Sequence, residues 1–311
     1  MRYYPETAPP IDLRPQRQRF QHRYGIHAVL LVATMFTTSL VGGCNAIGFQ
    51  QARGESGAFP LLEIIVLGLS YSLPFIIILG VHELGHYFYC RKHQVDATLP
   101  YFLPAPIPLT GTLGAVIKIR EPFPTTRALF DIGVAGPIAG FLALLPFLFW
   151  GVSMSIMIPF EPGEGTIYFG EPLLFKAVAW LQFGTRPEGH DIILHPMGFA
   201  AWFGLLATAL NMLPFGQLDG GHIVYALIGR RASYVSLATL AATLLLTTYS
   251  ASWWSMSVMM LAMALLIGFG HPRVLDESVA LDGRRKFIAF LAFVIFAVSF
   301  TPVPIELFFD Q

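Results

Sequence analysis

Five consecutive residues carry the clearest chemical signal in this sequence: His82-Glu83-Leu84-Gly85-His86. On a helix, residues four positions apart lie on one face, so both imidazoles can reach the same metal ion. Zn²⁺ is the metal expected for this spacing, and Glu83 is placed to act as general base toward an attacking water. A purely structural role is the alternative. Two His and one Glu at the end of an apolar segment are costly unless they serve a site, which disfavours it.

A catalytic zinc site usually has three protein ligands, so one more is needed. The candidates are His93, His190, His195, His222, Asp131, Asp219 and Cys90. Asp219 follows a stretch in which Pro214 and Gly216 interrupt a helix, and such a break at membrane depth is tolerated where it lines a buried or wet site. A carboxylate is also an accepted third ligand of hydrolytic zinc, so Asp219 is preferred.

The composition describes the surroundings of these residues. The 311 residues are 55% hydrophobic and 12% charged, with a mean hydropathy of +0.62. Soluble domains carry about 25% charged residues, so the composition predicts a membrane protein and excludes an ordinary soluble enzyme or a disordered chain. Two cysteines exclude a disulfide scaffold, and a net charge of zero gives no reason to expect a nucleic-acid partner.

Apolar segments predict an all-α polytopic membrane protein with six to seven transmembrane helices. The expected spans are 26–49, 61–90, 128–160, 196–213, 235–250, 254–270 and 287–300, with tilt or a break near Pro146 in the third. An alternative for the N-terminus is a lipoprotein signal cleaved before Cys44. An uncleaved span is preferred, because the apolar run continues to Phe49.

The basic residues predict the orientation of these spans. With seven spans and a cytoplasmic N-terminus, sixteen of the nineteen Lys and Arg fall on the cytoplasmic side. The acidic loop 160–195 is then external, which puts His190 and His195 on the wrong side to complete the metal site. His93 is interpreted as an ordinary solvated residue of a basic stretch, and Cys90 as a packed apolar thiol. Asp219 remains at the same depth as the two His.

The complete pattern resembles a known family. An H-E-x-x-H that ends one span, followed by N-x-x-P-x-x-x-L-D-G at 211–220, resembles the site-2 protease family of intramembrane metalloproteases, most closely its bacterial and plastid branch. The resemblance covers roughly residues 60–230 and includes L-P-Y-F at 99–102, G-T-L-G-A at 111–115 and A-G-P at 135–137. It implies that His82, His86 and Asp219 bind one zinc ion and that Glu83 is the catalytic base.

The expected domain organisation follows from the spans and the resemblance. An Arg-rich cytoplasmic segment (1–25) precedes a transmembrane metalloprotease domain (26–303, core about 60–230), and a short tail (304–311) follows. No PDZ-like domain is expected, because every loop is short, and no plastid transit segment is expected.

Three further features have a functional and a structural interpretation. Residues 98–127 are rich in Pro and Gly, and 114–120 alternate apolar and basic residues after Val116, which predicts a membrane-associated β-hairpin that presents substrate backbone; a polar loop is the alternative. Asn211 could bind the scissile carbonyl or its oxyanion, or else cap the broken helix. His222 could orient Asp219, or form a local hydrogen bond without function. The G-V-A-G-P segment at 133–137 is expected to serve close helix packing.

The leading hypothesis is therefore an intramembrane zinc endopeptidase that cleaves single-span membrane proteins within or beside their transmembrane segments, as in regulated intramembrane proteolysis. A metal transporter would explain the His and Asp residues but leaves Glu83 without a task. A catalytically inactive homologue acting as a membrane scaffold is the third possibility. The short Arg-rich N-terminus predicts a bacterial inner membrane, with the site near the cytoplasmic side. Substrate identity and oligomeric state are not specified by the sequence.

Overall fold

Three long helices dominate the computed structural model, which describes residues 20–55, 57–160, 166–267 and 274–307. They are α1 (Tyr24–Ala52), α2 (Leu61–Lys92) and α3 (Thr126–Ser153), and each is long and apolar enough to cross a membrane. At about 1.5 Å per residue, their 28 to 32 residues exceed the roughly 30 Å of a bilayer core. Val29, Val32 and Phe36 of α1 are exposed apolar side chains, as expected of a lipid-facing surface.

The remaining predicted spans correspond to shorter helices. These are α5 (Pro196–Asn211), α7 (Ala232–Leu246), α8 (Trp253–Ile267) and α9 (Gly283–Ser299), with 15 to 17 residues each. The described residues contain three helices that meet the length for a span. The count of six to seven therefore stays a prediction. Of the predicted N-terminal segment 1–25, residues 1–19 lie outside the described residues.

The predicted end of the third span at Phe160 was wrong. The helix α3 ends at Ser153 and continues through Pro146 without a break, whereas Ile156–Pro159 forms β3, which pairs antiparallel with β5 (His190–Ile193). The loop 160–195 also contains α4 (Leu173–Phe183). Hydropathy cannot separate a short apolar strand from the end of a helix, which explains the error.

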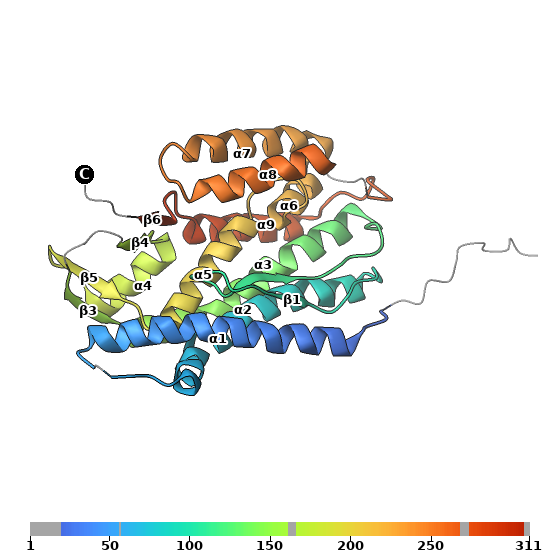
Figure 1. Cartoon of the computed structure of the whole chain (residues 1–311). Coiled ribbons are helices and arrows are strands. Elements are labelled where there is room, and N and C mark those ends of the chain that lie inside the picture. Colours follow the sequence, from blue (N-terminus) through green and yellow to red (C-terminus); the bar gives the residue numbers. More distant parts are fainter. Residues whose placement is uncertain (1–19, 56, 161–165, 268–273, 308–311) are drawn as a thin grey trace, which may run out of the picture.

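The predicted C-terminal tail is attached to the same region. Strand β6 (Ile305–Leu307) lies within it and pairs antiparallel with β4 (Ile167–Phe169). Together with β3 and β5, these strands lie at the end of α1 that is remote from its N-terminus (Figure 1). The fold is therefore mainly helical with three small two-stranded sheets among the described residues, rather than all-α.

The hairpin predicted after α2 is present. Strands β1 (Tyr101–Pro104) and β2 (Thr112–Val116) pair antiparallel, and Gly111 has φ +72° at the turn into β2. The second strand is shorter than the predicted 114–120. Beyond it, the backbone continues to pair less regularly through a bridge between Ala97 and Ile119. Six prolines in this segment limit regular pairing, because proline cannot donate to a ladder.

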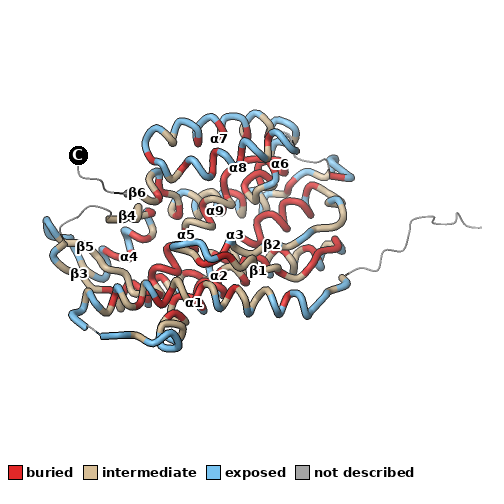
Figure 2. The backbone as a smooth tube through the Cα atoms, in the orientation of Figure 1, coloured by how far each residue is buried: buried red, intermediate tan, exposed pale blue. Residues whose placement is uncertain are grey.

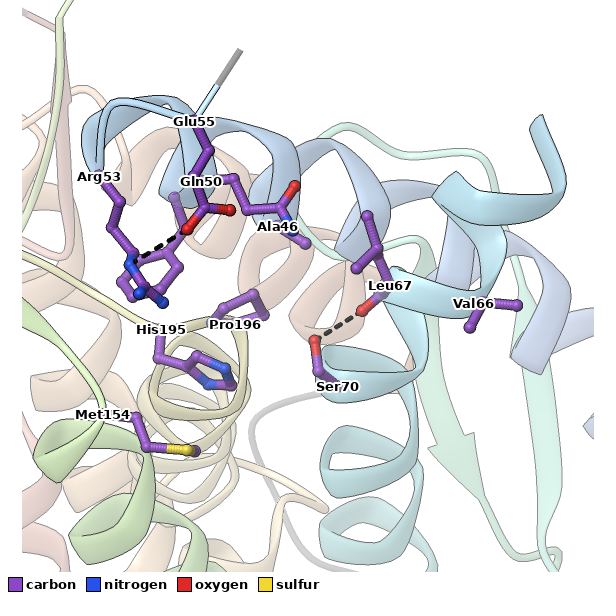
Figure 3. Close-up of a pocket in the computed structure, with 11 residues that line it drawn as sticks. Ala46, Gln50, Arg53, Glu55, Val66, Leu67, Ser70, Met154, His195 and Pro196 are labelled. Carbon is purple, nitrogen blue, oxygen red and sulfur yellow. Dashed lines mark hydrogen bonds and ion pairs between the residues drawn. The ribbon is translucent and has the colours of Figure 1, made fainter. Parts of the chain in front are cut away.

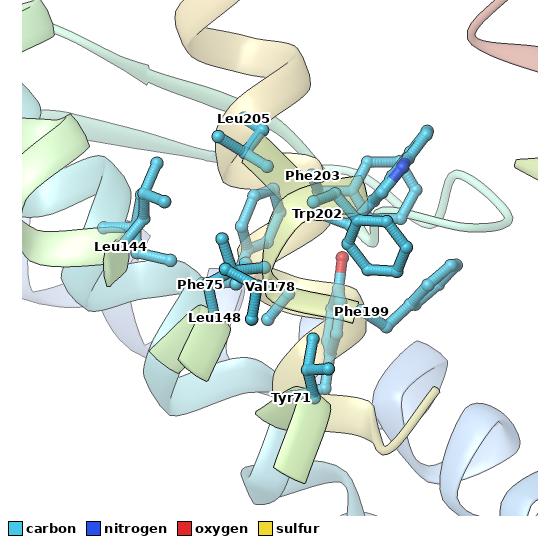
Figure 4. Packing of buried hydrophobic residues seen from close by; sticks show 14 of the residues in the cluster. Tyr71, Phe75, Leu144, Leu148, Val178, Phe199, Trp202, Phe203 and Leu205 are labelled. Atoms are coloured by element: carbon cyan, nitrogen blue, oxygen red, sulfur yellow. The ribbon is translucent and has the colours of Figure 1, made fainter. Parts of the chain in front are cut away.

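The largest aromatic cluster packs α2, α3, α4 and α5 together, as Figure 4 shows. Tyr71, Phe199 and Phe203 contact one another there, and Trp202 is 1% exposed. The indole Nε1 of Trp202 donates to the carbonyl of Gly170 at 2.7 Å, which satisfies its polar atom within the apolar core. Buried backbone is concentrated where these helices meet, and α7 is largely exposed (Figure 2). The helices that carry the predicted site are thus held by a well-packed interior.

Candidate metal centre

The helix α2 presents both histidines of the H-E-x-x-H motif to the protein interior. His82 and His86 are 6% and 7% exposed. They lie one helical turn apart, ten and six residues, respectively, before the end of α2 at Lys92. Their Nε2 atoms are 3.1 Å apart. The shared face predicted from the spacing is therefore the face that packs on α3.

Two glycines of α3 make room for these imidazoles. A Cβ at Gly136 would lie 2.0 Å from Nε2 of His86, and one at Gly140 would lie 2.9 Å from the Cβ of His82. Real Cβ atoms do not approach other atoms at the first of these distances. The helix α3 can therefore contact the histidine face of α2 only because these two positions lack side chains.

A backbone carbonyl orients His86. The Nδ1 atom of His86 donates to the carbonyl oxygen of Ile132 at 2.7 Å. With its proton on Nδ1, the neutral imidazole presents the Nε2 lone pair to the space shared with His82. An outer hydrogen bond of this kind typically fixes the tautomer and the ring plane of a metal-binding histidine.

The third side chain comes from a break between two helices. The helix α5 ends at Asn211, and α6 (Asp219–Ile228) begins after seven intervening residues, which form a turn in which Gly216 has φ +50°. Asp219 is thus the first residue of α6, where the helix dipole favours a carboxylate. A Cβ at Gly220 would lie 2.0 Å from the carbonyl oxygen of Met212, so the start of α6 packs tightly on the turn. The predicted interruption of the helix is confirmed.

The three side chains converge with a spacing that fits a metal ion. Asp219 Oδ2 is 3.2 Å from Nε2 of His82, and Oδ1 is 3.3 Å from Nε2 of His86. Tetrahedral zinc with ligands at about 2.0–2.1 Å separates any two ligand atoms by about 3.3 Å. Among the described residues, these three are the group of His, Cys, Asp and Glu that could hold a metal ion. Two imidazole nitrogens and a carboxylate oxygen are also the donor set of hydrolytic zinc sites.

Glu83 lies beside this group but is not part of it. It is 8% exposed, and its Oε1 is 4.0 Å from Nε2 of His82. The backbone N–H of Ile117, just past β2, lies close enough to its carboxylate to interact with it. The segment that follows β2 therefore lies beside the motif.

The comparison with protein families agrees with this geometry. Residues 70–249, more than half of the chain, match the model of the family described as Peptidase family M50. The chain belongs to peptidase family M50. The matched region includes the motif on α2 and Asp219 on α6, whereas α9 lies outside it.

Plant relatives support the same assignment. In Arabidopsis thaliana, the "Probable zinc metalloprotease EGY2, chloroplastic" is 33% identical over 206 residues and the "Probable zinc metallopeptidase EGY3, chloroplastic" 31% over 243. The "Probable zinc metalloprotease EGY1, chloroplastic" of Oryza sativa subsp. japonica is 30% identical over 234 residues. These alignments cover 63%, 72% and 68% of this chain but 36%, 40% and 39% of the relatives. The M50 chain therefore spans little more than a third of the length of the curated relatives it matches. No solved structure matches it.

The names of these relatives also bear on the predicted location. They are chloroplastic, which gives no support to the bacterial inner membrane predicted from the sequence. The apolar helices of the M50 chain do support a membrane protein.

Asn211 and His222 are near the site in sequence, and their roles stay predictions. Asn211 is the last residue of α5 and is partly buried. His222 lies one turn into α6, where its ring packs edge-on against Phe123 and a Cβ at Gly133 would be 2.7 Å from its own Cβ. These contacts are packing contacts. They fix where the ring of His222 lies without assigning it a task toward Asp219.

The other candidate ligands lie in different surroundings. Cys90 is fully buried among Val95, Ala97 and Ile132, as expected of a packed thiol. The prediction that His93 is an ordinary solvated residue was wrong, because its Nε2 is 2.9 Å from Oδ2 of Asp131. A carboxylate that a distant part of the chain supplies cannot be recognised from the basic stretch around His93 alone.

His195 lies at the other end of the helices. It precedes α5 and lines a cavity of about 470 Å³ with Arg53 and Glu55 (Figure 3). Its Nδ1 accepts from the N–H of Met197, and burial together with the nearby Arg53 lowers the pKa of its imidazole. His190 lies in β5 in the same region. Neither residue belongs to the metal-binding group.

Sequence reasoning missed three parts of this site. They are the carbonyl of Ile132, the N–H of Ile117 and the close approach of Gly136 and Gly140. The two backbone groups leave no signal in residue type. The glycines do leave one, because Gly133, Gly136 and Gly140 share a face of the helix at a spacing that allows close helix approach. The sequence correctly predicted close packing at these glycines. It did not predict that the packing partners are the histidine side chains of α2.

Proposed function

We propose that this chain is an intramembrane zinc metalloprotease, which hydrolyses peptide bonds within or beside transmembrane segments of single-span membrane proteins. The observation that carries the proposal is the group of His82, His86 and Asp219. Two of its members lie on a helix long enough to cross a membrane, with Glu83 next to them. Membership of peptidase family M50 and relatives named as zinc metalloproteases support the same chemistry.

Each polar side chain of the site has a task in this proposal. His82, His86 and Asp219 hold the zinc ion, which when bound supplies Lewis-acid polarisation and lowers the pKa of a water molecule. Glu83 takes a proton from the attacking water and returns it to the leaving amine. The N–H of Ile117 holds the carboxylate of Glu83 in place for both transfers. An ion path would need none of these proton transfers, so Glu83 favours hydrolysis over transport.

The hairpin is proposed to hold the substrate. Among the described residues, β2 pairs with β1 alone, so its second edge is open. Extended peptides commonly bind by adding a strand to such an edge. Because Ile117 follows β2 and contacts Glu83, a strand added there would run past the metal-binding group. A transmembrane helix keeps its backbone hydrogen bonds internal, so it must unwind before it can bind in this way.

We also propose that the shorter helices complete six to seven membrane crossings, with the N-terminus and the metal site toward the cytoplasmic side of a multi-pass membrane protein. The distribution of Lys and Arg supports this orientation. The depth of His86, six residues or about 9 Å before the end of α2, supports a site near that face.

The decisive experiment replaces the proposed base while keeping the ligands. Purified wild-type chain and Glu83→Gln are compared for zinc content by metal analysis and for cleavage of a single-span membrane protein. We expect zinc to be retained in Glu83→Gln and cleavage to fall by roughly 10²-fold or more. Glu63→Gln, an exposed position at the start of the same helix, is the matched control and should cleave normally.

Each alternative predicts a different result. Cleavage that survives in Glu83→Gln would exclude Glu83 as the base. A wild-type chain that binds zinc and cleaves no offered substrate would favour the inactive scaffold. Zinc uptake into vesicles without cleavage would favour the transporter.

A further inference from the structure

A charged cluster beside the metal centre is not used by the proposed mechanism. Asp131, on α3, is 7% exposed. Arg285 donates to it twice, from Nε to Oδ1 at 2.8 Å and from a terminal nitrogen to Oδ2 at 2.7 Å. His93 contacts Oδ2 at 2.9 Å, and Arg285 is held in turn by Asp282. Two parallel hydrogen bonds between a guanidinium and a carboxylate fix orientation as well as charge.

The cluster joins three helices that are far apart in sequence. His93 directly follows α2, Asp131 is on α3, and Arg285 is in the first turn of α9. Figure 1 shows α9 beside α3, and the two helices are in contact. The helix α9, which supplies Arg285, lies outside the residues that match the family model.

Asp131 is adjacent to the carbonyl that orients His86. The next residue, Ile132, is 1% exposed and accepts the Nδ1 hydrogen bond of His86. His86 lies on α2 and His93 directly follows it, seven residues later, and the two contact consecutive residues of α3. The C-terminal end of α2 therefore contacts α3 at two successive residues, through the backbone carbonyl of Ile132 and the side chain of Asp131.

We propose that Asp131, with Arg285 and His93, is a clamp that fixes the Ile132 carbonyl relative to α2 and so aims Nε2 of His86 at the metal. Asp131 and Arg285 are positioning residues, because they touch none of the metal-binding atoms. The proposal rests on the proposed function, since it assumes that His86 binds zinc. Outer partners of metal-binding histidines typically contribute about 10–100-fold to metal affinity.

The clamp explains why the charges are buried at this point. A carboxylate as enclosed as Asp131 is costly unless it is paired and hydrogen-bonded, and removing one partner of such a pair is strongly destabilising. Apolar side chains would be sufficient to pack α3 against α9. The bidentate geometry instead specifies one position of α3 against α9, and His93 links the same carboxylate to the end of α2. A defined position of α3 is what a short hydrogen bond between His86 and Ile132 requires.

The test measures zinc affinity in the full-length chain, purified in detergent and competed against a chelator. Arg285→Gln should weaken zinc binding by about tenfold or more. Arg284→Gln is the matched control, because it removes the same charge from the adjacent exposed position of α9. Arg285→Lys should restore part of the affinity, since a lysine keeps the charge but loses the fork.

A double variant distinguishes a role in positioning His86 from a general loss of folding stability. If both residues act through one clamp, Asp131→Asn combined with Arg285→Gln should lose no more affinity than the worse single variant. Additive losses would overturn the proposal. A lower melting temperature for Arg285→Gln with wild-type zinc affinity would also overturn it, because the cluster would then only join helices. Failure of the wild-type chain to bind zinc would overturn the proposed function and this inference together.

Discussion

At the scale of single residues, the site depends on the absence of side chains at two glycines of α3 as well as on the metal-binding side chains. The imidazoles of His82 and His86 occupy the space that side chains at Gly140 and Gly136 would fill. The rings are also fixed from behind, because Nδ1 of His86 is bound to the Ile132 carbonyl. Because the His86 imidazole is held at Nδ1, it cannot move away from a new methyl group near Nε2 without losing its hydrogen bond to Ile132 or its position beside the other ligands.

The variant Gly136→Ala tests this close approach. The new Cβ would lie 2.0 Å from Nε2 of His86, so the ring must rotate away from Asp219 and His82. We expect zinc affinity to fall by more than about tenfold, measured by chelator competition. Gly48→Ala, on α1, is the control, because a Cβ there has nothing within 4 Å. Unchanged affinity in Gly136→Ala would contradict the rigid contact between α2 and α3.

The residue scale is also where sequence reasoning was most informative. Metal-binding chemistry needs particular residue types, so His82, His86 and Asp219 could be selected by type, spacing and depth, and the structure brings them together. The partners supplied by Ile132 and Ile117 are backbone groups, which every residue type can provide. No pattern of residue types marks which carbonyl or N–H will face a site, so these contacts could be found only in three dimensions.

At the scale of elements, two irregular segments complete what the regular helices begin. The turn between α5 and α6 places Asp219 at a helix start, and the strand-like continuation after β2 places the N–H of Ile117 on Glu83. Proline and glycine signalled both irregularities in the sequence. The end of α3 and the helix α4 were missed, because apolar runs without a distinct period fit either strand or helix.

The hairpin's contact with Glu83 gives a prediction for Ile117→Pro. Proline lacks the N–H that binds the Glu83 carboxylate, so the base loses its lateral support while the zinc ligands are untouched. We expect kcat to fall by roughly tenfold or more with zinc content unchanged, in an assay with a single-span substrate. Ile117→Ala keeps the N–H and should retain most activity. Equal activity of the two variants, both folded, would remove the hairpin from the mechanism.

At the scale of the whole molecule, the net charge is zero, but the Lys and Arg residues are unevenly distributed along the sequence. Sixteen of nineteen basic residues lie in the segments assigned to one side, and Arg53, Lys176 and Arg186 are the exceptions. Of these, Arg186 is neutralised by Glu171 and Asp191, and Arg53 pairs with Glu55. Two of these three cations thus have acidic partners nearby. The proposed orientation, in which α2 ends toward the cytoplasm, therefore rests on the distribution of Lys and Arg alone.

Labelling of introduced cysteines can test this orientation directly. In a background of Cys44→Ser and Cys90→Ala, single cysteines replace Glu188, in the loop assigned outside, or Arg284, at the exposed start of α9. Because basic flanks are retained in the cytoplasm, a membrane-impermeant maleimide should label Glu188→Cys in intact cells and Arg284→Cys only after permeabilisation. Retained zinc content in each variant verifies that the fold is intact. The reverse labelling pattern would move the metal site to the external face, where a different set of substrate segments would reach it first.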